Sequence, residues 1–178
     1  MMLELHNVSV GDRIQRLSLT VTDGQMLCIA GQQGSGKTTL LRAVLGFLPL
    51  KEGHISIDGE LLTPRSAPYF RRQMAYVPQH LSVPDGYTAV PTDYLQLLER
   101  AVHSGKKLLI IDEPSEEVTP ETADAIDCLL QKATQRGATV LAITLRNATL
   151  HCVPHSYLQV GEPSGGRTPS PNTQHLTL

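Results

Sequence analysis

The stretch Gly31-Gln32-Gln33-Gly34-Ser35-Gly36-Lys37-Thr38 decides how the rest of the chain is interpreted. It follows the apolar run 26–30 and precedes residues 38–48, whose apolar side chains recur at helical spacing until Gly46 and Pro49. A loop of the form G-x-x-x-x-G-K-[ST] between a strand and a helix surrounds a phosphate chain with backbone N–H donors. The following helix N-terminus adds a partial positive charge. The sequence therefore predicts a strand, a phosphate-binding loop and a helix in succession.

The side chains of this loop have distinct expected roles. Lys37 can reach the β- and γ-phosphates, and the Thr38 hydroxyl is an expected ligand of Mg²⁺. Thr39 lends a further hydroxyl. The alternative, a glycine-rich turn without a ligand, does not account for four fixed residue types in this context. We expect a Mg-bound nucleoside triphosphate, ATP above others, with the binding residues Gly31, Gln32, Gln33, Gly34, Ser35, Gly36, Lys37, Thr38 and Thr39.

Two carboxylates end the second strongly apolar run. The expected strand 107–111 is continuously apolar after the lysines at 106 and 107, as in the middle of a parallel sheet, and Asp112 and Glu113 follow. Ligands of open α/β sheets bind at the carboxyl ends of strands. We expect Asp112 to hold the metal and Glu113 to polarise an attacking water as general base. The alternative is two solvated residues at a strand end.

The remaining segments alternate between strand and helix patterns. Strands are expected at 3–5, 17–21, 54–57, 74–77, 139–143 and near 157–160, and helices at 93–103, with Thr92 as N-cap, and 120–135. This βαβ order predicts a doubly wound, mostly parallel sheet. Residues 161–178 are rich in Pro, Gly, Ser and Thr, so we expect a disordered tail after a single domain spanning 1–160.

Charge and composition exclude several classes of function. A formal net charge of −2 gives no global attraction to nucleic acid or to an anionic membrane, so we expect no nucleic-acid partner. No stretch reaches the roughly 18 uncharged apolar residues of a spanning helix, and the start has no signal-peptide pattern, so a cytoplasmic location is expected. Cys28, Cys128 and Cys152 are too widely spaced for a disulfide framework or a zinc pattern, which predicts reduced, mostly buried thiols.

Three motifs together resemble the ATP-binding cassette (ABC) subunits of transporters: the glycine loop, Tyr76-Val77-Pro78-Gln79, and Leu108-Leu109-Ile110-Ile111-Asp112-Glu113-Pro114. Residues 52–59 also resemble that family's antiparallel subdomain. The resemblance runs over about 3–161. It implies a P-loop NTPase fold of the RecA-like ABC type, an α/β sheet covered by helices on both faces, with a small N-terminal antiparallel β subdomain. It also implies that Gln79 senses Mg²⁺ and the γ-phosphate, and couples the site to a membrane partner.

The chain departs from the family's pattern at several places. Residues 88–92 stand where the signature Leu-Ser-Gly-Gly-Gln is expected, and only 80–87 remain of the helical subdomain, which implies a deletion. Thr119 replaces an aspartate, and Leu145 replaces the switch histidine, although leucine cannot hydrogen-bond a γ-phosphate. Val10 stands where an aromatic ring normally stacks on adenine. It is expected to offer apolar contact to the base but no π-face.

These matches and departures leave three functions open. The leading hypothesis is a reduced ABC-type ATP-binding protein with weak or partner-dependent hydrolysis of ATP to ADP and phosphate. The resemblance implies a permease and a full-length ABC ATPase as partners, at the inner face of a membrane. The second is a nucleotide-gated adaptor that binds ATP without turnover. The third, a small P-loop kinase, requires an acceptor site and an arginine-bearing lid, and the sequence indicates neither.

Overall fold

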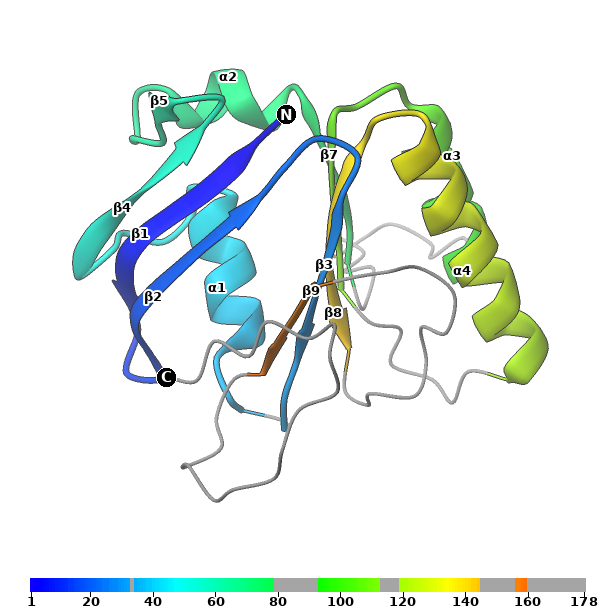
Figure 1. Ribbon diagram of the computed structural model, residues 1–178, viewed down its shortest axis with the longest axis horizontal. Helices are drawn as coiled ribbons and strands as arrows, with labels where there is room; N and C mark the ends of the chain where they lie inside the picture. Colours follow the sequence, from blue (N-terminus) through cyan, green and yellow to red (C-terminus); the bar gives the residue numbers. More distant parts are fainter. Residues whose placement is uncertain (33, 79–92, 113–118, 145–155, 160–178) are drawn as a thin grey trace, which may run out of the picture.

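The computed structural model describes residues 1–32, 34–78, 93–112, 119–144 and 156–159, which form two β-sheets with helices packed against them (Figure 1). The antiparallel sheet has the strand order β2-β1-β4-β5, and the parallel sheet has the order β6-β7-β8-β3-β9. The antiparallel strands are β1 (Leu3–Val10), β2 (Ile14–Val21), β4 (Glu52–Ile57) and β5 (Glu60–Leu61). The parallel strands are β3 (Met26–Ala30), β6 (Met74–Val77), β7 (Leu108–Ile111), β8 (Thr139–Thr144) and β9 (Ser156–Gln159).

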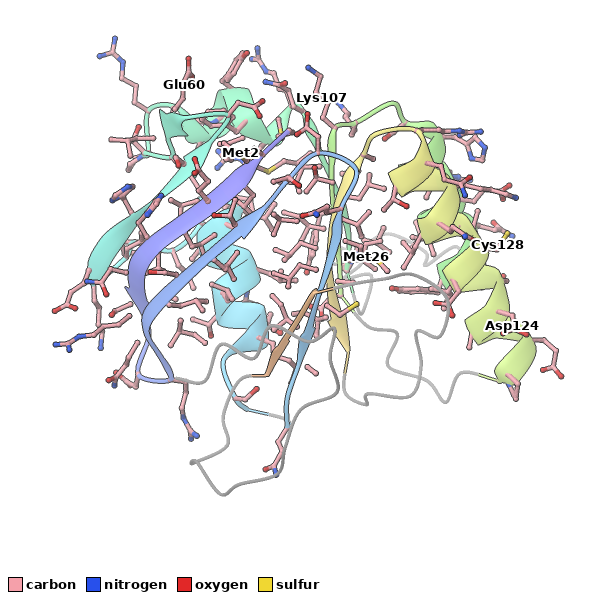
Figure 2. The ribbon with its side chains drawn as sticks, in the orientation of Figure 1. Met2, Met26, Glu60, Lys107, Asp124 and Cys128 are labelled. Carbon is pink, nitrogen blue, oxygen red and sulfur yellow. The ribbon has the colours of Figure 1, made fainter. Side chains whose placement is uncertain are left out.

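Helix α1 (Lys37–Val44) lies between the two sheets (Figure 1). Its buried residues Leu40, Leu41 and Val44 share one hydrophobic core with Leu3 of β1 and Ile29 of β3. Figure 2 shows side chains filling the space on both sides of this helix. Because burial of apolar surface is the main favourable term in folding, this core attaches the antiparallel sheet to the parallel one.

The opposite face of the parallel sheet is covered by α3 (Tyr94–His103) and α4 (Pro120–Gln135), which lie side by side (Figure 1). Leu98 and Leu130 of these helices pack with Cys28 and Val140 of the sheet in a second core. Helices therefore cover both faces, and the predicted α/β fold with an N-terminal antiparallel subdomain is confirmed. Among the helices of the described ranges, none is long and apolar enough to cross a membrane.

Several predicted boundaries agree with the structure and others require correction. Helix α4 and strand β6 have the predicted bounds, 120–135 and 74–77. Helix α1 ends at Val44 and not at residue 48, because the N–H groups of Gly46 and Phe47 donate to Ala43 and Arg42 carbonyls in a Schellman arrangement. The N-cap of α3 is Asp93 and not Thr92, since the Asp93 side chain accepts from the Leu95 N–H at 3.2 Å.

Two short elements had no sequence signal. Strand β5 has two residues and α2 (Ala67–Arg71) has five, both too short for a periodic pattern.

The predicted burial of the thiols holds for Cys28 but is wrong for Cys128, which is exposed on α4 (Figure 2). The expected tail 161–178, the signature position 88–92 and Leu145 lie outside the described residues.

Candidate nucleotide-binding site

The glycine loop reaches α1 through Gly36, which has a left-handed backbone with φ 99°. A Cβ added there would lie 3.0 Å from Cβ of Arg13 and 3.2 Å from side-chain atoms of Ile14, so the hairpin between β1 and β2 packs directly against the loop. Gly36 is also the N-cap of α1 and offers no side-chain acceptor. The first N–H groups of α1 are therefore not occupied by a capping side chain, as an anion site at a helix N-terminus requires.

Lys37 places its charge inside this loop. Its side chain is buried, and Nζ donates to the Gly31 carbonyl at 2.6 Å and to the Gln32 carbonyl at 2.7 Å. The Ser35 hydroxyl, also buried, accepts from Nζ at 3.4 Å. These oxygens solvate the buried ammonium and hold the Lys37 side chain inside the loop.

The remaining loop residues are open to a ligand to different degrees. Thr38 and Gln32 are exposed, and apart from its chain neighbours Gly34 has no atom of the described part of the chain within 4 Å of the position that a Cβ would take. Thr39 is half-buried, with its methyl group facing Gly11 at the hairpin tip. The exposed Thr38 hydroxyl is a hard oxygen donor of the kind that Mg²⁺ prefers.

Asp112 is buried at the end of β7, on the face of the sheet that α1 covers. Ile110 packs in the core shared with α1, whereas Leu109 and Ile111 pack toward α3 and α4. Successive side chains of a strand alternate between faces, so Asp112 projects on the same side as Ile110. Only β8 separates β7 from β3, which puts the two strand ends roughly 10 Å apart. The carboxylate and the glycine loop therefore share one edge and one face of the sheet.

Two tyrosines that the sequence analysis did not single out contact Asp112. The Tyr94 hydroxyl donates to the Asp112 backbone carbonyl at 2.6 Å. Burial, and then the charge of Asp112, raises the pKa of the Tyr76 phenol, while Arg42 opposes this shift and a hydrogen bond with the Asp112 side chain adds to it. Tyr76 belongs to the motif Tyr76-Val77-Pro78-Gln79, whereas no sequence signal distinguishes Tyr94 from other residues of an amphipathic helix.

Two predicted residues have other places than expected. The Val10 side chain is 1% exposed, which contradicts its expected apolar contact with a base. The turn after β1 is so short that Val10 pairs with Ile14 and packs in the core beneath the hairpin. Thr119 is the N-cap of α4, and its hydroxyl accepts from the Thr122 N–H at 3.3 Å. Substitution of the family's aspartate by threonine thus fits a capping role.

Three predicted site residues, Gln33, Gln79 and Glu113, lie outside the described residues. The structure describes the strands that lead to two of them, since β6 precedes Gln79 and β7 precedes Glu113. The Asp112 N–H donates to the Val77 carbonyl at 2.8 Å, so β6 and β7 stay hydrogen-bonded to each other up to their carboxyl ends. Within the described ranges, no group of three or more His, Cys, Asp and Glu side chains forms a separate metal site.

A glycine loop between β3 and α1, with a carboxylate at the end of β7 in the same parallel sheet, places the protein among the P-loop NTPases. Solved structures share this fold. An ATP-binding subunit of an ABC transporter matches 84% of this chain and 81% of its own length, with a TM-score of 0.65 and 21% identity. A bacterial Atm1-family ABC exporter with ATP bound matches 90% of this chain and 37% of its own, with a TM-score of 0.70 and 20% identity.

Sequence comparisons agree with the fold. A model of the ABC transporter family matches residues 14–92. The spermidine/putrescine import ATP-binding protein PotA of Haemophilus ducreyi is 34% identical over 128 residues, covering 70% of this chain and 31% of that protein. The vitamin B12 import ATP-binding protein BtuD of Yersinia pseudotuberculosis is 40% identical over 82 residues, covering 46% and 32%. In sequence and in fold the chain is therefore similar to the ATP-binding subunits of ABC transporters. It spans about a third of the length of these curated relatives.

Proposed function

We propose that the protein binds Mg-ATP through residues 31–39 and Asp112, as an ATP-binding subunit of an ABC-type transport complex. The observation that carries this proposal is the buried Lys37 ammonium, whose Nζ donates to the Gly31 and Gln32 carbonyls inside the loop, at the start of a helix that has no side-chain cap. Such a loop attracts an anion of high charge density, because the lysine and the helix N-terminus act on the same point.

The donor set also fits a magnesium ion. The Thr38 hydroxyl and the Asp112 carboxylate supply hard oxygens at the same edge of the sheet, and Gln79 follows the neighbouring strand β6. When bound, Mg²⁺ would neutralise and orient the phosphate oxygens. In this proposal Thr38, Gln79 and Asp112 hold the metal, directly or through water, and Lys37 meets the terminal phosphates.

Hydrolysis is the conditional part of the proposal. Glu113 follows Asp112 directly and is our candidate general base, so the chain keeps a residue able to polarise water. The relatives named as import ATP-binding proteins support a membrane permease as partner, and the substituted signature position 88–92 supports a full-length ABC ATPase as a second one. We propose that turnover is weak until such partners complete the site, at the inner face of a membrane.

The test of nucleotide binding is calorimetric titration of the chain with Mg-ATP, comparing wild type with Lys37→Ala. Removal of one partner from a buried charged interaction costs about 2 to 5 kcal/mol, which corresponds to a loss of affinity of tens- to thousands-fold. Lys132→Ala is the matched control, because Lys132 is exposed in the last turn of α4. An unchanged affinity in folded Lys37→Ala would refute the assignment of the loop.

An adaptor that binds ATP without turnover is the second candidate, and the position of Thr119 favours it. Its hydroxyl caps α4, so no carboxylate stands there to act on the site. The two candidates differ in their response to Glu113→Gln. The substitution abolishes a biochemical readout that depends on turnover, whereas it leaves a readout that depends on ATP occupancy unchanged.

A further inference from the structure

Asp112 is held from both faces of the parallel sheet. Tyr94 lies in the first turn of α3, and its hydroxyl donates to the Asp112 carbonyl oxygen at 2.6 Å across 18 residues of sequence. Tyr76 lies on β6 opposite Ile110 and therefore projects on the same face as Asp112. Burial and then the charge of Asp112 raise the pKa of the Tyr76 phenol, and Arg42 on α1 lowers it, so the phenol lies near both charged groups.

The backbone of Asp112 is held by hydrogen bonds on both of its polar groups. The Asp112 N–H donates to Val77 at 2.8 Å and the Asp112 carbonyl accepts from Tyr94, so both polar groups of its backbone have partners on different elements. With the backbone held in this way, the direction of the carboxylate depends on the side-chain torsions, and the Tyr76 phenol on the same face of the sheet limits which of them are favourable. A carboxylate that is already oriented loses less conformational freedom when it meets a cation.

We propose that Tyr94 and Tyr76 are positioning residues that preorganise the Asp112 carboxylate for the divalent cation of the bound nucleotide. The inference rests on the proposed function, because it concerns the metal part of that same site. It makes a separate claim, which is that the hydroxyl groups of Tyr94 and Tyr76 set the affinity for the metal through Asp112. Partners that orient a ligating carboxylate commonly change metal affinity by about 10- to 100-fold when they are removed.

The two tyrosines act on different atoms of Asp112, so the loss of metal affinity should differ between the two substitutions. Tyr76→Phe removes the hydroxyl group near the carboxylate itself and is expected to weaken metal binding by about tenfold or more. Tyr94→Phe removes a donor from the backbone carbonyl and should weaken it by a smaller factor, about three- to tenfold. Tyr94→Phe keeps the ring that packs on the core beneath α3, so the substitution changes the hydroxyl alone.

The experiment separates metal binding from nucleotide binding. The affinity of Mn²⁺, as a paramagnetic substitute for Mg²⁺, is measured by electron paramagnetic resonance with ATP present, and the affinity of metal-free ATP is measured in EDTA. Wild type, Tyr76→Phe and Tyr94→Phe are compared with Tyr69→Phe, an exposed tyrosine on α2 that serves as the matched control. Thermal unfolding of each variant shows whether the fold is kept.

The expected result is a weaker Mn²⁺ affinity for Tyr76→Phe and Tyr94→Phe, with metal-free ATP affinity within twofold of wild type and Tyr69→Phe unchanged. Unchanged Mn²⁺ affinity, or an equal loss for metal and metal-free nucleotide, would overturn the inference. If Tyr94→Phe does not fold, Tyr76→Phe decides, because Tyr76 is 42% exposed. A wild-type chain that binds neither form of ATP would refute the proposed function, and normal wild-type binding with insensitive variants would refute only the role of the tyrosines.

Discussion

Replacing Gly36 by alanine tests whether the fit between the hairpin and the glycine loop determines the start of α1. The new Cβ would lie 3.0 Å from Cβ of Arg13 and 3.2 Å from Cγ1 and Cδ1 of Ile14. Ile14 is fully buried, so it has little room to move, and Cβ of Arg13 is held by the backbone of the hairpin. Alanine would also have to adopt φ 99°, outside the usual regions for L-residues.

The magnitude follows from these two effects. A strained backbone of this kind costs about 1 to 3 kcal/mol, and overpacking against a rigid core costs about 1 to 3 kcal/mol more. The expected loss is therefore about 2 to 6 kcal/mol of the free energy of unfolding, a large part of the roughly 5 to 15 kcal/mol of a typical domain. Gly34→Ala is the matched control, because Gly34 also has positive φ, 81°, but among the described residues beyond its chain neighbours no atom lies within 4 Å of its Cβ position. Only the backbone strain, about 1 to 3 kcal/mol, applies there.

The assay is urea unfolding of wild type and both variants, followed by circular dichroism. Gly36→Ala is expected to lower the midpoint clearly more than Gly34→Ala, with a similar dependence on denaturant. Equal losses would show that the hairpin yields to the new methyl group and that the close packing is not a constraint. An unchanged Gly36→Ala would refute both parts of the reasoning.

Two further predictions concern the thiols and turnover. Burial, and secondly the charge of Asp127, raises the pKa of Cys28 to about 12. At pH 8 iodoacetamide should therefore modify the exposed Cys128 and leave Cys28 intact until the protein unfolds, which peptide mass spectrometry can measure. Rapid modification of Cys28 in the native protein would contradict its burial. Phosphate release by the isolated chain should be slow at all protein concentrations, because a copy of this chain has no signature sequence to offer, and loss of one preorganised donor costs about 3 to 4 kcal/mol. A rate of several per second that Glu113→Gln abolishes would show that the site closes by other means.

The glycine loop and most of the fold could be predicted because their signals are local. Residues 31–38 carry four fixed residue types between a strand and a helix, and α4 has the bounds 120–135 that the sequence predicted. The buried strands were recognisable from continuous apolar runs such as 108–111. Each of these patterns depends on residues a few positions apart, so the sequence alone is enough to predict the loop, the helix and the buried strands.

The surroundings of the carboxylate depend on contacts that the tertiary structure alone brings together. Asp112 meets Tyr94 across 18 residues of sequence, and it meets Tyr76 because the parallel register places β6 beside β7. Val10 stands at the family's ring position in sequence, yet the short hairpin pairs it with Ile14 and buries it. Strand register and the packing of α3 on the sheet are set by the burial of many side chains together, so the choice of partner for a single hydroxyl is decided only when the whole core has formed.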